Sequence, residues 1–95
     1  MSLPSVEMST TVQTVSVTNT SAAVTNPFSD STTHVRLVCT VDCHILFGTS
    51  PTATTAKTYL PADHVEYFKV TDAANTKIAA IRAGSNDGTL YVSEF

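Results

Sequence analysis

A chain of 95 residues with a net charge of −3 and only five Lys or Arg residues carries too little positive charge to neutralise many phosphates, which argues against direct nucleic-acid binding. It has no apolar run of about eighteen residues, so we expect no membrane-spanning helix. Ser and Thr supply more than a quarter of the residues; Thr favours strands and Ser favours turns. The composition therefore predicts a small all-β protein that leaves part of its apolar surface in water.

The first segments of the chain are predicted to be an arm and a strand. Residues 1–10 show no hydrophobic period, which is typical of an extended N-terminal arm, and they lack the basic and apolar regions of a signal peptide. Residues 12–18 form a Val/Thr run typical of a strand. Val12 and Val15 break its strict alternation, which predicts a bulge or a start at Thr14.

A short strand follows at residues 22–24. It ends at Pro27, because proline cannot donate to a ladder and pushes the preceding residue out of the helical region. Phe28 is predicted to be a core anchor within the connection that follows.

The longest uninterrupted period lies in residues 33–48, where apolar and other residues alternate as in a half-buried strand, pause near Asp42, and resume. We interpret this stretch as a tight hairpin with Val41 and Asp42 in the turn. The predicted register places two pairs opposite each other, Cys39 with His44 and Thr40 with Cys43.

The next segment, residues 49–57, is rich in small polar residues and contains Pro51, so we expect an exposed loop. Residues 65–70 then alternate as a strand. Phe68 and Val70 are the candidates for its buried side.

The last third is predicted to hold two more strands. Residues 77–83 favour a strand, although two isoleucines three apart leave a helical turn as the alternative. Residues 84–88 resemble a hairpin connection, with Gly88 at a positive φ. Residues 89–93 alternate as the final strand.

Together these segments predict an all-β fold, a small antiparallel β-sandwich or jelly-roll-like barrel of about seven or eight short strands, in which residues 11–95 form a single domain. The Cys, Trp and Cys spacing of antibody domains is absent.

No catalytic motif is present, so we expect no enzyme activity, no catalytic residue and no cofactor. The residues that could hold a metal ion lack ligand spacing, and we expect no metal site; they are His34, His44, His64, Asp42 and Asp63. Cys39 and Cys43 are predicted to be buried free thiols in a reducing cytoplasm. A disulfide across the hairpin, or zinc held with a histidine, is the alternative.

Several large residues have no clear inward direction: Phe28, Leu46, Tyr59, Tyr67 and Tyr91. Outward aromatics on a strand are favoured where another protein covers them, so a like subunit or a larger surface would be a suitable partner. The alternative is that a thin sandwich simply leaves a few large residues exposed.

From Val35 onward, about two-thirds of the chain, the segments follow in the order VRLVCTVDCHILFG, the small-residue loop TSPTATT, TYLPADHVEYFKV and the final TKIAAIRAGSNDGTLYVSEF. This order resembles that of a group of short virion proteins of tailed bacteriophages. It implies a capsid decoration or cement protein, made in the host cytoplasm and bound to the outside of the major capsid protein shell at subunit junctions. A homo-oligomer, trimer or dimer, is expected.

For such a protein, we expect partner contacts from the arm, from the loop and from two outward tyrosines. These residues are Leu3, Pro4, Val6, Met8, Pro51, Thr52, Tyr59 and Tyr67. The alternatives are a phage tail, neck or receptor-binding module, or a small carbohydrate-binding domain. The last of these would show a concave site lined by aromatics and carboxylates.

Overall fold

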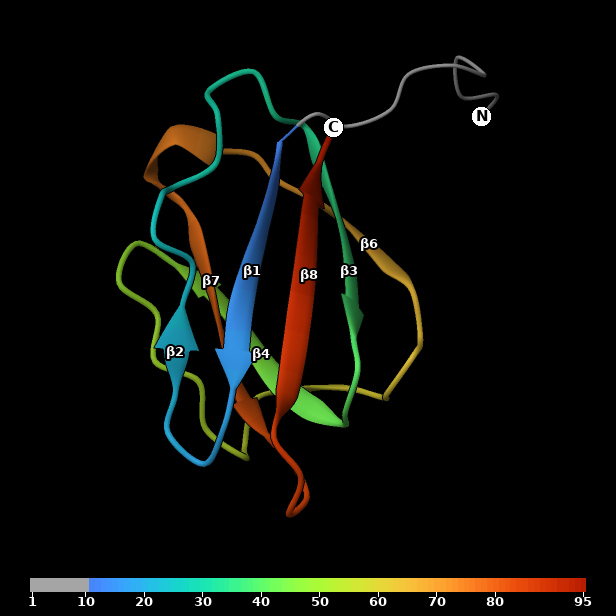
Figure 1. The fold of residues 1–95 in the computed structure, drawn as a ribbon. Coiled ribbons are helices and arrows are strands. Elements are labelled where there is room, and N and C mark those ends of the chain that lie inside the picture. The colour runs from blue at the N-terminus through green and yellow to red at the C-terminus, as the bar shows by residue number, and fades with distance from the viewer. Residues whose placement is uncertain (1–10) are drawn as a thin grey trace.

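The computed structural model describes residues 11–95, which form eight strands and one short 3-10 helix (Figure 1). In chain order they are β1 (Val12–Val17), β2 (Ala22–Ala23), β3 (His34–Cys39), β4 (Cys43–Gly48), β5 (Thr58–Leu60), β6 (Glu66–Lys69), η1 (Ala73–Asn75), β7 (Lys77–Arg82) and β8 (Gly88–Glu94). The predicted arm, residues 1–10, lies outside the described part. Within that part, no helix is long and apolar enough to cross a membrane.

The strands form two four-stranded antiparallel sheets that pack face to face. Sheet A has the order β1-β8-β3-β6, and sheet B has the order β2-β7-β4-β5. Figure 1 shows β1, β8 and β3 side by side in one layer, with β7 and β4 in the layer behind them. The prediction of a small antiparallel β-sandwich is confirmed.

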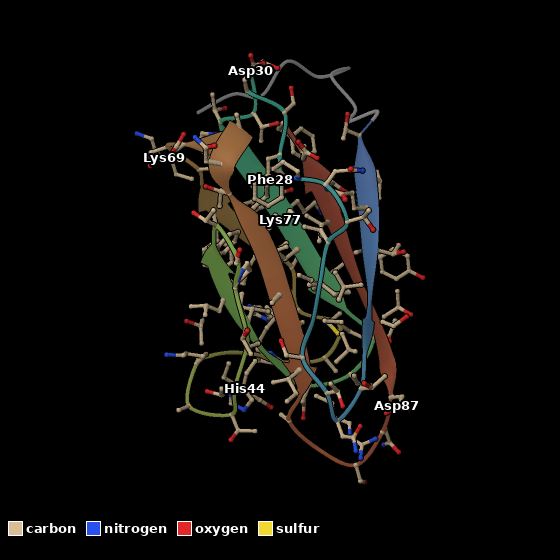
Figure 2. The ribbon with its side chains drawn as sticks, turned by 90° about the vertical axis from the view of Figure 1, so that its left-hand side faces the viewer. Phe28, Asp30, His44, Lys69, Lys77 and Asp87 are labelled. Atoms are coloured by element: carbon tan, nitrogen blue, oxygen red, sulfur yellow. The ribbon has the colours of Figure 1, made fainter. Side chains whose placement is uncertain are left out.

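The core lies between the two sheets because alternate residues of the central strands point inward. Leu37 and Leu90 come from sheet A, and Ile45 and Ile78 from sheet B; each is at most 2% exposed. Phe28 fills the space between the layers towards one end of the sandwich (Figure 2). Its predicted role as a core anchor is confirmed.

The predicted hairpin within residues 33–48 is wrong, because β3 and β4 belong to different sheets. β3 pairs with β6 and β8, whereas β4 pairs with β5 and β7. Residues 40–42 cross from one sheet to the other, so Cys39 and Cys43 enter the core from opposite layers. Alternation identifies the buried face of a strand but not its neighbour, and this is why the pattern misled us.

Residues 84–88 are also a crossing and not the predicted hairpin, since β7 lies in sheet B and β8 in sheet A. Gly88 does not have a positive φ, which corrects the second part of that prediction. A Cβ atom at Gly88 would lie 2.6 Å from both Thr40 Oγ1 and Val41 Cγ2. Glycine therefore allows the start of β8 to approach the β3–β4 crossing closely.

Three other strand predictions have clear outcomes. β1 pairs with β8 in one continuous register from Val12 to Val17, so neither a bulge nor a start at Thr14 is present. β7 is a strand and not a helical turn, as we predicted for residues 77–83. β6 directs Phe68 and Val70 to the core side, as predicted. By contrast, the short strand β5 was not predicted, because its three residues are too few to show a period.

Candidate interaction surface

The three histidines that could have formed a metal site lie apart from one another. His34 begins β3 in sheet A, whereas His44 lies on β4 in sheet B, with its Nδ1 2.9 Å from the carbonyl oxygen of Lys57. His64 follows β5, and its Nε2 lies 3.0 Å from Glu66 Oε1. In residues 11–95 no three His, Cys, Asp or Glu residues are grouped so that they could hold a metal ion.

The two cysteines are free and fully buried, as predicted, although they come from opposite sheets. Their thiols are hydrogen-bonded to each other, and this bond, with burial second, raises the pKa of Cys43. Neither thiol reaches the surface, so neither can meet a substrate or a reagent while the sheets stay together.

We consider two of the clefts formed by residues 11–95. The larger, about 320 Å³, is lined by Phe47, Gly48, Phe68, Lys69, Val70, Thr71 and Thr76. The second, about 210 Å³, is lined by Thr40, Val41, Asp42, Ala62, Gly84, Ser85 and Asn86. The first contains aromatics without a carboxylate, and the second a carboxylate without an aromatic. Neither has the combined lining expected of a sugar site.

The outer face of sheet A carries the main exposed apolar surface. We call its four large exposed residues the aromatic face: Val12, Tyr67, Tyr91 and Phe95, which are 53%, 54%, 43% and 40% exposed. The strand registers place Val12, Ser93, Arg36 and Tyr67 in one row across the four strands. The rings of Tyr67 and Phe95 lie 6.5 Å apart at their centroids. The four side chains therefore share one face of sheet A, and two of them are in ring contact.

The charge on this face is opposite in sign to that of the whole chain. Its outward positions include Arg36 and His34 on β3, and Lys69 opposite His34 on β6. The strands of sheet A carry two acidic residues, Glu66 and Glu94. Both occupy inward positions of their strands, so they point away from this outer face. A chain of net charge −3 thus presents an apolar, aromatic and basic face. Such a face suits a partner surface that is apolar and acidic.

The outer face of sheet B is different because residues 49–57 cover it. Ile78 and Ala80 of β7 point into the core, so Ala79 between them points to the outer side of sheet B. Ala79 is nevertheless 0% exposed. Ala53 of the loop is 2% exposed, and its N–H donates to Ser21 Oγ at 2.8 Å, which anchors the loop beside β2. Figure 2 shows this segment on the side of sheet B that faces away from sheet A. The predicted loop is largely exposed, but its inner residues seal sheet B.

The predicted contact residues fall in three separate places. Leu3, Pro4, Val6 and Met8 lie outside the described residues, and Pro51 and Thr52 belong to the loop over sheet B. Tyr59 is 51% exposed on β5, with its ring 5.4 Å from His44. Its hydrogen bond to the Asp42 carboxylate raises its pKa. Of the four predicted contact residues that the structure describes, Tyr67 alone lies on the aromatic face.

Three members of the aromatic face, Val12, Tyr91 and Phe95, were missing from the predicted contact residues. The signal for Tyr91 was available, because Leu90 and Val92 alternate with it and are both fully buried. The same parity gives an outward direction for Phe95. That these two residues and Tyr67 share one face could not be predicted without the strand order β8-β3-β6.

We compared the chain with family models, with curated proteins and with solved structures, and none of them matches it.

Proposed function

We propose that this protein is a non-enzymatic structural protein that attaches to a larger assembly through the aromatic face, and that the assembly is the head of a tailed bacteriophage. In this role it is a decoration protein, bound outside the major capsid protein shell at subunit junctions. The observation that carries the proposal is the aromatic face itself, an apolar and basic surface that residues 11–95 leave exposed although residues 49–57 lie over the opposite sheet.

The physical requirements of decoration agree with this geometry. Each copy of so small a domain buries only a modest interface, so many copies must act together on a pre-formed shell. A ligand that binds only the assembled shell stabilises that state by mass action. Aromatic side chains supply most of the binding energy of such interfaces, and the arginine among them adds orientation.

The proposal is tested by adding the purified protein to expanded shells of its phage that lack it. We expect saturable binding at a copy number that matches the lattice, and a higher melting temperature of the shell. The paired change Tyr67→Ser with Tyr91→Ser should weaken binding at least about tenfold, because two hot-spot aromatics are lost.

The matched control is Tyr59→Ser, since Tyr59 is equally exposed but lies on sheet B. It should bind as the unchanged protein does. Failure of the unchanged protein to bind the shell would overturn the decoration role, and binding to purified tails instead would assign it to the tail or neck. Equal weakening by all three tyrosine changes would contradict the assignment to the aromatic face.

A further inference from the structure

The four edge strands of the sandwich are not protected equally. β2 and β5 have two and three residues, and β6 has four, with Glu66 and Lys69 among them. β1 has six residues with the sequence VQTVSV, without a charge, a proline or a bulge. Short length, charge, proline and bulges are the devices that keep an edge from pairing with another chain. β1 has none of them.

The hydrogen-bond pattern shows which groups of β1 face the open edge. The N–H of Glu94 donates to the carbonyl oxygen of Thr11, so these two residues form a hydrogen-bonded pair between the strands. Such pairs alternate along an antiparallel ladder, so the odd-numbered residues of β1 bond to β8. The N–H and C=O groups of Val12, Thr14 and Ser16 therefore point away from β8. Within the described part of the chain, β1 pairs with β8 alone.

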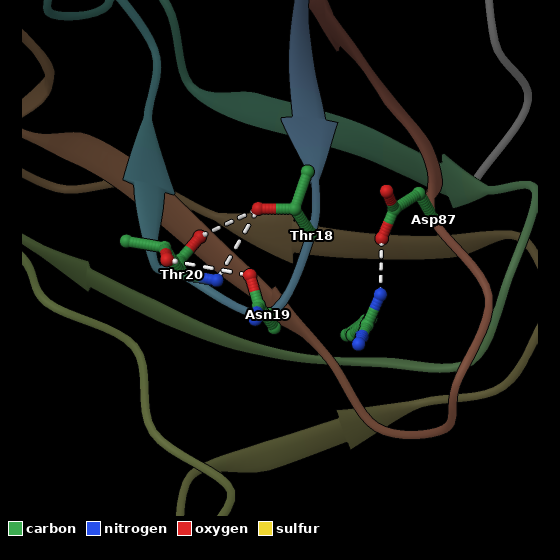
Figure 3. Close-up of polar contacts among 5 residues, drawn as sticks. Thr18, Asn19, Thr20 and Asp87 are labelled. Carbon is green, nitrogen blue, oxygen red and sulfur yellow. Dashed lines mark hydrogen bonds and ion pairs between the residues drawn. The ribbon is translucent and has the colours of Figure 1, made fainter.

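This edge is also held in a fixed position. At its end, the carbonyl oxygen of Thr18 accepts a hydrogen bond from the N–H of Arg82 at 2.9 Å. Figure 3 shows the Thr18 hydroxyl accepting the N–H of Thr20. The Arg82 side chain is paired with the Asp87 carboxylate. An edge that is already ordered loses little conformational entropy when a second strand adds to it.

We propose that β1 pairs antiparallel with β1 of a second copy of this chain, about a two-fold axis that passes between the two Thr14 residues. Thr14 then lies opposite Thr14 of the second copy, and Val12 lies opposite Ser16. This register uses all three open residues of each strand in three hydrogen-bonded pairs, with two bonds in each pair. The two copies of sheet A become one continuous eight-stranded sheet.

The surroundings of the strand fit a second copy of the chain. No charged side chain lies on β1, and Glu94 of the neighbouring β8 is directed to the inner side, so pairing two copies brings no carboxylates together on the outer face. Within one copy Thr14 lies opposite Tyr91. In the dimer the outward row therefore runs from Tyr91 to Thr14 of one copy and on to Thr14 and Tyr91 of the second copy. The arrangement closes on itself, because each copy has one such edge and uses it once.

This dimer adds to the proposed function without resting on it. The two-fold axis is perpendicular to the joined sheet, so both aromatic faces lie on the same side. One dimer can then meet a flat assembly with twice the surface of a single copy.

The first test is amide hydrogen exchange on the full chain at several protein concentrations. The N–H groups of Val12, Thr14 and Ser16 should become protected as concentration rises, whereas those of Gln13, Val15 and Val17 should be protected throughout. Sedimentation equilibrium on the same samples should show a monomer and dimer. A protein that remains monomeric up to millimolar concentration would overturn the proposal.

The second test changes the strand. Thr14→Pro removes an N–H that faces the open edge and leaves the ladder to β8 intact, a position where edge strands tolerate proline. Two lost hydrogen bonds, one for each copy, should raise the dissociation constant about tenfold or more. Thr14→Lys should do the same by placing two ammonium groups opposite each other.

The matched control is Thr58→Lys, which adds the same charge to an exposed edge residue of sheet B and should leave the dimer unchanged. If Thr14→Pro does not fold, Thr14→Lys decides the result. A dimer that survives Thr14→Lys, or is weakened equally by Thr58→Lys, would place the contact elsewhere and overturn the pairing of β1. If the unchanged protein dimerises but does not bind the shell, the attachment role is rejected and the dimer still stands.

Discussion

The outer faces of the two sheets differ in how far their outward residues are exposed to water. Ala79 and Tyr91 occupy equivalent places, each directed outward from the strand next to an edge, β7 in sheet B and β8 in sheet A. Ala79 is 0% exposed and Tyr91 is 43% exposed. The difference comes from residues 49–57, which fold back over sheet B and have no counterpart over sheet A among residues 11–95. Within this range the chain covers part of one outer face and leaves the aromatic face exposed.

The largest expected effect comes from placing a carboxylate at these two equivalent positions. Ala79→Asp buries an unpaired charge beneath the loop and should lower the free energy of unfolding by about 3 kcal/mol or more. Tyr91→Asp leaves the charge in water and should cost about 1 kcal/mol, mainly through lower strand propensity. Urea denaturation of both variants measures the difference.

Thiol accessibility supplies an independent readout of the same pair of variants. Cys39 and Cys43 lie between the sheets and should react with a thiol reagent only when the sandwich opens. Ala79→Asp should therefore speed their modification, whereas Tyr91→Asp should change the rate little. Equal rates and equal unfolding free energies would show that the loop does not seal sheet B.

The two glycines of the β7–β8 connection repeat the contrast between covered and open positions on a smaller scale. Gly88→Ala forces a Cβ atom against Thr40 and Val41 and should cost about 1–3 kcal/mol of stability by overpacking. Gly84 has no atom within 4 Å of an added Cβ and no positive φ. Gly84→Ala should therefore raise stability by about 0.4–1 kcal/mol, because it restricts the unfolded chain. Thermal denaturation compares the two, and a reversed order would contradict the close approach at Gly88.

The sequence predicted the strands better than their partners, for a physical reason. The burial of Leu37 and Ile45 follows from alternation, which any strand with one covered face shows. The choice between a hairpin and a crossing at residues 40–42 depends on contacts with distant segments, including the bond from the Thr40 N–H to the Thr89 carbonyl oxygen. Among the described strands, only β4 and β5 are both consecutive and paired, so short turns were a poor guide to pairing.

The interaction surface was predictable in part. The outward direction of Tyr67 and Tyr91 follows from the alternation of their strands, and an exposed aromatic pair favours a partner. The burial of Ala53 could not be predicted, because a small residue in a polar loop carries no hydrophobic period, and the burial of Ala79 on the outer side of β7 could not be predicted without knowing where that loop lies. Their cover depends on the hydrogen bond to Ser21, which lies 32 residues before Ala53.

The hydrogen bond from the Ala53 N–H to Ser21 Oγ, which anchors residues 49–57, gives a third test of the difference between the two faces. Ser21→Ala removes the acceptor of the buried Ala53 N–H and should cost about 1 kcal/mol. Its clearest sign should be faster hydrogen exchange at Ala53, without faster exchange in β8. Ser31→Ala is the control, since its hydroxyl is hydrogen-bonded to the exposed Ser29 hydroxyl. Uniformly faster exchange across both sheets would show that the loop cannot open separately from the fold.

The smallest expected change in stability belongs to the open face. Tyr67→Ser should alter the free energy of unfolding by about 0.5 kcal/mol or less, because its side chain is 54% exposed. The ring contacts Phe95 at the rim of the patch and contributes nothing to the core cluster. We therefore expect Tyr67 to be dispensable for folding, and under the proposed attachment role its size and aromatic character serve contact with another molecule. A loss of more than about 2 kcal/mol in urea denaturation would show instead that the aromatic face supports the fold.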